Sequence, residues 1–162
     1  MTALIIELSL LLIALTSQSL AQALPSLPEP AKDLFVGTWK ANADKSRPEN
    51  KGYALVVTYS RDGDTLVESS RRRFLDGLHE YNDRMRCDGK LHQAEYSGAS
   101  CWVSCKYLAT NHIEGTRSES YNNEMTYWTR EVSSDGQKLT VWEYKDKARK
   151  KLKGLLVRER VK

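Results

Sequence analysis

Three consecutive arginines, Arg71, Arg72 and Arg73, are the residues of this sequence best suited to bind an anion. They lie in a stretch typical of a β-strand, where successive side chains point to opposite faces of the sheet. Arg71 and Arg73 therefore share one face, and Arg72 occupies the other. An arginine inside a β-barrel could hold a carboxylate headgroup, because its guanidinium forms two parallel hydrogen bonds to a carboxylate. We select Arg71 and Arg73 as candidate ligand contacts; the alternative is an exposed outer face.

The three cysteines, Cys87, Cys101 and Cys105, indicate one disulfide and one remaining thiol if the chain meets an oxidising compartment. Cys101 and Cys105 lie in one expected strand, which places their Cα atoms ~13 Å apart, whereas a disulfide needs roughly 4.4–6.8 Å. Cys87 must then take one of them. We predict Cys87–Cys101, because both lie at the ends of expected strands, with Cys105 as a buried thiol. Three reduced cysteines are the alternative.

The sequence carries no recognisable catalytic motif. It has no glycine-rich phosphate loop, no Gly-x-Ser-x-Gly elbow and no His-Glu-x-x-His pair. His79, His92 and His112 are far apart, so a metal site would require the fold to gather them. The acidic residues mostly mark turns and form no pair with separate acid and base roles. We therefore expect no enzyme activity, no metal and no cofactor.

Ten short stretches rich in β-branched and aromatic residues alternate with turn sequences along the chain. The expected strands are residues 35–40, 53–60, 65–74, 78–87, 90–96, 101–108, 112–120, 125–133, 138–145 and 155–161. Asp-Gly pairs, which are typical of tight hairpin turns, occur at 62–63, 76–77, 88–89 and 135–136. Many short strands with tight turns indicate an all-β sandwich or barrel.

The first expected strand carries a glycine and a tryptophan on one face. Gly37 permits a bend or a close approach, and Trp39 is large enough to close one end of a barrel. Gly37-Thr38-Trp39 resembles the Gly-x-Trp signature of lipocalins and fatty-acid-binding proteins, together called calycins. Residues 35–46 and 132–141 are similar to small exported bacterial proteins with a lipocalin-like domain. The resemblance implies a single antiparallel up-and-down β-barrel of about 8–10 strands.

The last expected strand limits this resemblance. Fatty-acid-binding proteins hold the fatty carboxylate with an Arg-x-Tyr pair, and Leu156 and Arg158 stand at those positions here, so that site is not carried over. Lipocalins place a basic side chain of the last strand over the first-strand tryptophan, a cation–π contact worth ~0.5–2 kcal/mol. The resemblance implies that Arg158 or Arg160 does this to Trp39. We select Arg158, with Gly37 and Trp39, as the residues that close the barrel.

The N-terminal region has its own composition. Residues 8–16 form a short apolar run followed by small residues, which is typical of a secretory signal peptide and too short for a membrane anchor. We expect cleavage after Ala21 or Ala23 and a secreted or periplasmic location. No Lys or Arg precedes the run, so an uncleaved helix or a misassigned start is the alternative. The expected division is a signal peptide (1–23), a proline-rich leader (24–33) and a lipocalin-like barrel domain (34–162).

The expected function is non-enzymatic binding of a small hydrophobic or amphipathic ligand, lipid-like or fatty-acid-like, inside a monomeric barrel. A barrel slightly larger than the smallest can hold one small ligand, and burial of apolar surface would supply the affinity. Beside the two arginines, the candidate ligand contacts are Cys105, Tyr107, Tyr127 and Val141. We expect no binding of nucleic acid.

A second basic run, Lys145–Lys153, supports an alternative function. A polybasic stretch is attracted to an anionic membrane surface, although many such runs are only solvated loops. The net charge of the chain, +4, has the same sign. The alternative is a solid-cored cell-envelope protein that binds anionic lipid or a protein partner through Arg71–Arg73 and Lys145–Lys153.

Overall fold

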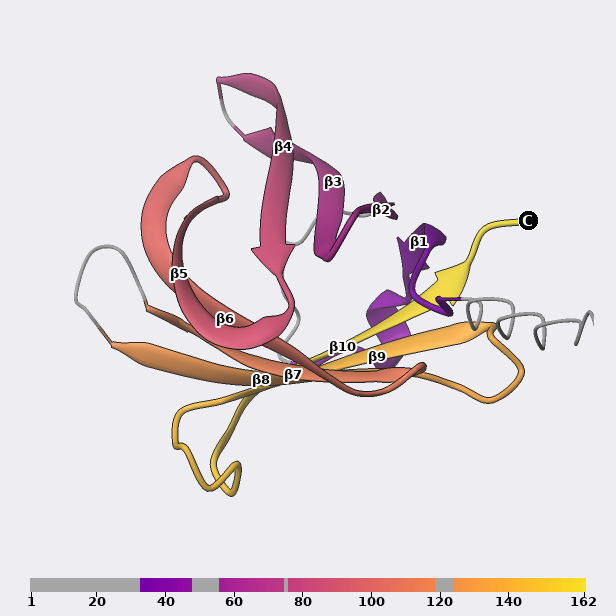
Figure 1. Cartoon of the computed structure of the whole chain (residues 1–162). Coiled ribbons are helices and arrows are strands. Elements are labelled where there is room, and N and C mark those ends of the chain that lie inside the picture. The colour runs from indigo at the N-terminus through magenta and orange to yellow at the C-terminus, as the bar shows by residue number, and fades with distance from the viewer. Residues whose placement is uncertain (1–32, 48–55, 75, 119–123) are drawn as a thin grey trace, which may run out of the picture. The chain divides into compact units, whose positions relative to one another are not determined.

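The computed structural model of the chain describes residues 33–47, 56–74, 76–118 and 124–162 (Figure 1). The expected signal peptide, and all of the expected leader except Asp33, lie outside these residues. In the described part of the chain, no helix is long and apolar enough to cross a bilayer.

Ten antiparallel strands make up almost all of the described structure, and one 3₁₀ helix, η1 (Ala43–Lys45), follows the first of them. The strands are β1 (Gly37–Ala41), β2 (Val56–Asp62), β3 (Thr65–Phe74), β4 (Gly77–Arg86), β5 (Asp88–Tyr96), β6 (Ala99–Ala109), β7 (His112–Ser118), β8 (Met125–Val132), β9 (Lys138–Tyr144) and β10 (Leu152–Arg160). The predicted all-β class is confirmed. The strands form where β-branched and aromatic residues recur between turn residues.

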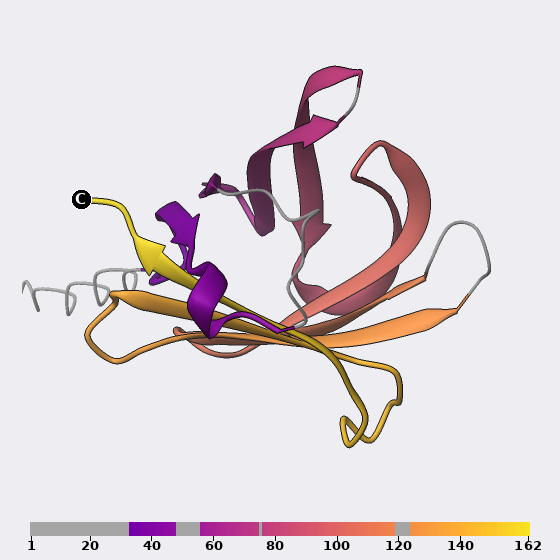
Figure 2. The ribbon, with the colours of Figure 1, turned by 180° about the vertical axis from the view of Figure 1, so that it is seen from behind.

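The strands form one sheet in the order β4-β3-β2-β1-β10-β9-β8-β7-β6-β5. Nearly every strand pairs with its neighbours in sequence, and the β1–β10 ladder joins the first strand to the last, with Trp39 opposite Arg160. The sheet curls so that its two edge strands, β4 and β5, face each other across a seam without strand pairing (Figures 1 and 2). The predicted single up-and-down barrel is confirmed, and it is nearly closed.

Apolar side chains fill one end of the barrel, which we call the closed end. It lies beside the β2–β3, β6–β7 and β8–β9 turns, because its residues flank those turns in sequence. Because side chains alternate along a strand, every second residue points toward the interior, and at this end most of those residues are apolar. The largest buried side chains there are Phe35, Trp39, Leu66, Met85, Ile113, Val132 and Leu139. The Trp39 indole Nε1 donates a hydrogen bond of 2.9 Å to the carbonyl of Phe35, so its polar group is satisfied.

Arg160 covers Trp39 at this end. Its guanidinium lies 4.1 Å from the centre of the Trp39 ring and donates hydrogen bonds to the carbonyls of Leu34, Val36 and Gly136. Gly37 has φ +134°, and a Cβ there would collide with the Arg160 side chain.

The prediction that Arg158 covers Trp39 is wrong. Arg158 and Arg160 share the inward face of β10, but the β1–β10 register places Arg160 opposite Trp39 and Arg158 opposite Ala41. Arg158 therefore reaches the middle of the interior.

The disulfide joins Cys87 to Cys105, with Cα atoms 4.2 Å apart. The predicted Cys87–Cys101 pairing is wrong, because the β5–β6 ladder places Cys101 opposite Ala94, whereas the start of β5, next to Cys87, lies beside Lys106. Asp88-Gly89 is accordingly no hairpin turn but an irregular start of β5, with Gly89 at φ +82°. Cys101 is a buried thiol opposite Ala94. The bond ties the short β4–β5 connection to β6 at one end of the seam.

Candidate functional site

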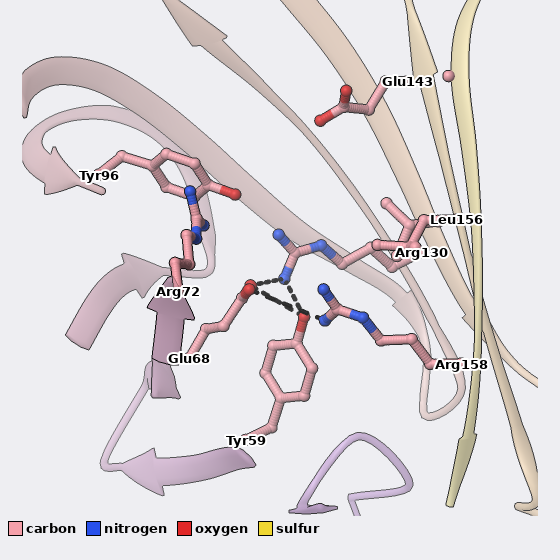
Figure 3. A pocket seen from close by; sticks show the side chains of 10 residues that line it. Tyr59, Glu68, Arg72, Tyr96, Arg130, Glu143, Leu156 and Arg158 are labelled. Atoms are coloured by element: carbon pink, nitrogen blue, oxygen red, sulfur yellow. Dashed lines mark hydrogen bonds and ion pairs between the residues drawn. The ribbon is translucent and has the colours of Figure 1, made fainter. Parts of the chain in front are cut away.

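The barrel interior changes from apolar to charged beyond the closed end. A small cavity of about 20 Å³, room for a single water molecule, lies among these polar side chains. Its lining comes from β2, β3, β5, β8, β9 and β10 (Figure 3). The lining residues are Tyr59, Glu68, Arg72, Tyr96, Arg130, Val141, Glu143, Gly154, Leu156 and Arg158.

Glu68 is the centre of this site. It is 3 % exposed, and its Oε2 accepts hydrogen bonds of 2.9 Å from the Tyr59 hydroxyl and from Arg130 Nη1. The same Arg130 nitrogen also donates to the Tyr59 oxygen at 2.9 Å. Arg158 approaches from β10, with its Nη1 3.9 Å from Glu68 Oε1. Figure 3 shows Tyr59, Arg130 and Arg158 converging on this one carboxylate.

The electrostatics of the cluster favour the charged forms of its ions. Burial alone would raise the pKa of Glu68, but Arg130, Arg158 and the Tyr59 hydrogen bond outweigh it and lower that pKa. Burial would lower the pKa of Arg130, and the neighbouring Tyr59 and Glu68 raise it instead. Burial raises the pKa of Tyr59, so this hydroxyl stays protonated and can donate to Glu68. The cluster therefore holds an ionised carboxylate beside two arginines.

Asp83 forms a second acidic centre, at the seam. It is 2 % exposed on β4, and its Oδ1 accepts a hydrogen bond of 2.7 Å from the backbone N–H of Ser97 in the β5–β6 turn. Arg72 Nη2 lies 4.0 Å from Oδ2. Burial raises the pKa of Asp83 to about 6, against the lowering effects of Ser97 and Arg72. The Asp83–Ser97 bond crosses the seam that the strand ladders leave open.

Further charges line the end of the interior opposite the closed end, which we call the open end. Arg117 lies over the Tyr96 ring at 4.3 Å, and its Nη2 is 3.6 Å from Glu143. Burial raises the pKa of Tyr96. This end presents guanidinium, carboxylate and phenol groups, which can hydrogen-bond and orient a polar headgroup.

Of the residues selected from the sequence, Val141 lines the cavity. The interior arginine of the run is Arg72, whereas Arg71 points outward, with its side chain 71 % exposed and paired with Glu80 at 2.7 Å. The selection of Arg71 was therefore wrong, because the register of β3 turns residues 66, 68, 70 and 72 toward the barrel interior. The side chain of Arg73 lies outside the described part.

The remaining selected residues lie away from the cavity. Cys105 is in the disulfide at the seam. Tyr107 is at the closed end, where its hydroxyl donates to Asp33 Oδ2 at 2.9 Å and its ring meets Phe35 edge-on. Tyr127 is half-buried on the other face of β8 from the buried Trp128 and Arg130, and it borders a surface groove with Lys145 and Lys153. None of these three residues lines the polar cavity. Cys105 and Tyr107 lie on the inward face of β6 but at the seam and the closed end, whereas Tyr127 lies on the outer face of β8.

The sequence alone did not reveal the set formed by Tyr59, Glu68, Arg130 and Arg158. A signal existed for Arg130, which shares a strand face with Trp128, a natural interior residue. Charged residues at inward positions of several different strands are unusual, since buried charges need partners. Recognising them required the inward face of each strand, and that follows from the barrel closure.

The loop between β9 and β10, residues 145–151, carries the second basic run and projects from the barrel in Figure 1. Asp146 accepts hydrogen bonds from the backbone N–H groups of Lys150 and Lys151, at 3.3 and 2.6 Å. Arg149 pairs with Glu114 at 2.9 Å. The carboxylate of Asp146 therefore stabilises the loop backbone. Exposed on its surface are Lys145, Lys147, Lys150 and Lys151, beside the half-exposed Leu152.

Within the described ranges, no three His, Cys, Asp or Glu side chains are grouped as a metal site would require. His79 and His92 instead contact Asp76 and Asp88, at 3.0 and 2.9 Å.

No family model matches the chain, and no curated protein matches it. Among solved structures, a fatty acid binding protein of Schistosoma mansoni in complex with arachidonic acid is 15 % identical, with a TM-score of 0.58 over 80 % of this chain and 97 % of that one. A luciferase domain from the dinoflagellate Lingulodinium polyedrum is 10 % identical, with a TM-score of 0.50 over 83 % of this chain. The match spans 45 % of the luciferase-domain chain. At these identities the likeness shows the fold, a calycin-like β-barrel.

Proposed function

We propose that this chain is an exported, non-enzymatic protein that binds one small hydrophobic or amphipathic ligand inside its barrel. The observation that carries the proposal is the convergence of buried hydrogen-bonding groups on an interior cavity, with apolar side chains beside it. Ligand sites commonly combine apolar walls with a few placed polar groups. The solved fatty acid binding protein, which is in complex with arachidonic acid, is consistent with such a role for the same fold.

Ligand entry requires the interior to expand. The cavity of about 20 Å³ is far below the several hundred Å³ of a small-molecule site. The side chains that would have to move are at the open end, where Arg72, Tyr96 and Arg117 are long and held by polar contacts. When these side chains move, a ligand or water can take over their hydrogen bonds. Water cannot replace the apolar contacts of the closed end in the same way.

Export is part of the proposal. The apolar run at residues 8–16 followed by small residues is typical of a secretory signal, and the Cys87–Cys105 disulfide is consistent with an oxidising compartment.

The test is uptake of a fluorescent lipid probe, together with native mass spectrometry of protein purified from an exporting host. We expect one probe per chain. Val141→Trp, which fills the cavity lining, should abolish uptake, and Tyr127→Trp on the outer face of β8 should not. A bare protein mass with no probe uptake by the unsubstituted chain would contradict the proposal.

A second candidate function follows from the same small cavity. A barrel filled by its own side chains would act through its surface, and the exposed lysines of the β9–β10 loop would then bind anionic lipid. Each lysine near such a surface contributes about 1 kcal/mol, and the attraction weakens as salt rises.

Sedimentation with vesicles that contain phosphatidylserine tests this candidate. We expect salt-sensitive binding that Lys147→Glu with Lys150→Glu abolishes, while Lys138→Glu, at the opposite end of β9, leaves it unchanged. Equal binding to neutral vesicles would contradict it.

A further inference from the structure

A carboxylate already occupies the arginine cluster of the barrel. Glu68 accepts hydrogen bonds from Tyr59 and Arg130, and Arg158 stands 3.9 Å away. Two arginines and a hydroxyl around one carboxylate are the groups that would otherwise receive the carboxylate of a ligand. The protein has filled this position with its own side chain.

The other interior acids are matched in the same way. Asp83 faces Arg72, and Glu143 faces Arg117. Arg158 is the remaining arginine, and its nearest acid is Glu68. A second carboxylate that approached Arg158 would therefore stand close to the buried negative charge of Glu68, and like charges at such a distance repel strongly in a low-dielectric interior.

The cavity still offers hydrogen-bond donors. The Nε atoms of Arg72, Arg130 and Arg158 are buried and have no hydrogen-bond partner among the described residues. Buried donors are normally satisfied, so a headgroup in this cavity is expected to present acceptor atoms. A hydroxyl, ester or amide oxygen accepts a hydrogen bond without adding a negative charge beside Glu68.

We propose that Glu68 determines which headgroup the barrel accepts, and that the ligand is a neutral amphiphile with a hydroxyl or carbonyl headgroup, such as a monoacylglycerol. A fatty acid anion is disfavoured because it must compete with Glu68 for the same donors. This inference rests on the proposed ligand-binding function.

The test compares two ligands of equal chain length, monolaurin and laurate, by calorimetric titration at pH 8, where laurate is ionised. We expect the unsubstituted chain to bind monolaurin at least about tenfold more tightly than laurate. A tenfold ratio of affinities is the same free-energy difference as a shift of one pKa unit. Glu68→Gln keeps an acceptor for Tyr59 and Arg130 but removes the charge, so it should tighten laurate binding at least about tenfold. Glu131→Gln, which removes an exposed carboxylate from the outer face of β8, should leave the ratio of the two affinities unchanged.

The outcomes separate the two proposals. Tighter laurate binding by the unsubstituted chain, or a ratio that Glu68→Gln does not change, overturns the role of Glu68 while ligand binding stands. Binding of neither ligand by the unsubstituted chain and Glu68→Gln overturns both. The comparison on the unsubstituted chain decides the headgroup class even if Glu68→Gln does not fold.

Discussion

The closed end and the open end of the barrel interior lie on the same strands but are built from opposite chemistries. At the closed end, apolar side chains pack on Trp39, and Arg160, which covers the Trp39 ring, is satisfied by three backbone carbonyls. From the middle of the interior to the open end, arginines and acids face one another at 2.9–4.0 Å. Apolar burial contributes stability directly, whereas buried ion pairs are largely offset by their desolvation. The difference indicates that stability is concentrated at the closed end, and that the open end is where binding groups can be exchanged.

The largest effect is expected at Trp39. Trp39→Ala removes a fully buried indole and the surface on which Arg160 rests, so it should lower the free energy of unfolding by about 4 kcal/mol. Chemical denaturation monitored by circular dichroism measures this loss. Trp102→Ala, at a half-exposed position on β6, is the matched control and should change stability by less than about 1 kcal/mol. Equal losses in the two variants would contradict a closed end that dominates stability.

The disulfide at the seam is expected to have the next largest effect. Cys87→Ala with Cys105→Ala should cost about 3 kcal/mol, because the bond closes a loop of 18 residues and limits the unfolded chain. Denaturation with and without reductant measures it. Reductant should lower the stability of the parent and not that of the double variant. Cys101→Ala should leave the response to reductant intact, since Cys101 is outside the bond.

Local patterns predicted the fold, while the site depended on non-local geometry. The ten strands followed from β-branched runs and turn residues, which act over a few positions. On β9, the selected Val141 does line the cavity, and alternation places Leu139 and Glu143 on the same inward face. For β3, alternation separated Arg72 from Arg71 but could not say which was inside.

The disulfide shows the same limit of local reasoning. Asp88-Gly89 has the sequence of a hairpin turn, yet it starts β5. The disulfide partner of Cys87 is therefore Cys105 and not the predicted Cys101. The role of Arg160 likewise depended on the β1–β10 register, which pairs residues more than a hundred positions apart. Registers between distant strands are set by closure of the whole barrel.

Asp83 should make the seam sensitive to pH, with a smaller effect. Its pKa is raised from 3.8 to about 6, so between these values the folded chain holds a proton that the unfolded chain has released. Stability from this group is therefore greatest below about pH 4, falls as pH rises toward 6, and is constant above, a loss on the order of 2 kcal/mol. Asp83→Asn keeps an acceptor for Ser97 and should remove this decline. Denaturation of both proteins at pH 4, 5, 6 and 7 measures the difference, and parallel pH profiles would contradict the assignment.

The smallest effect is expected at the Arg117–Glu143 pair of the open end. Replacing both by apolar residues of similar volume, Arg117→Met with Glu143→Leu, removes an attraction and two desolvation penalties together. The free energy of unfolding should change by less than about 1 kcal/mol, whereas Glu143→Leu alone leaves the Arg117 charge without its carboxylate and should cost more. A double-mutant cycle by chemical denaturation measures both values. A loss in the double variant as large as that of Trp39→Ala would show that the open end stabilises the barrel as strongly as the closed end does, and the contrast between the two ends would fail.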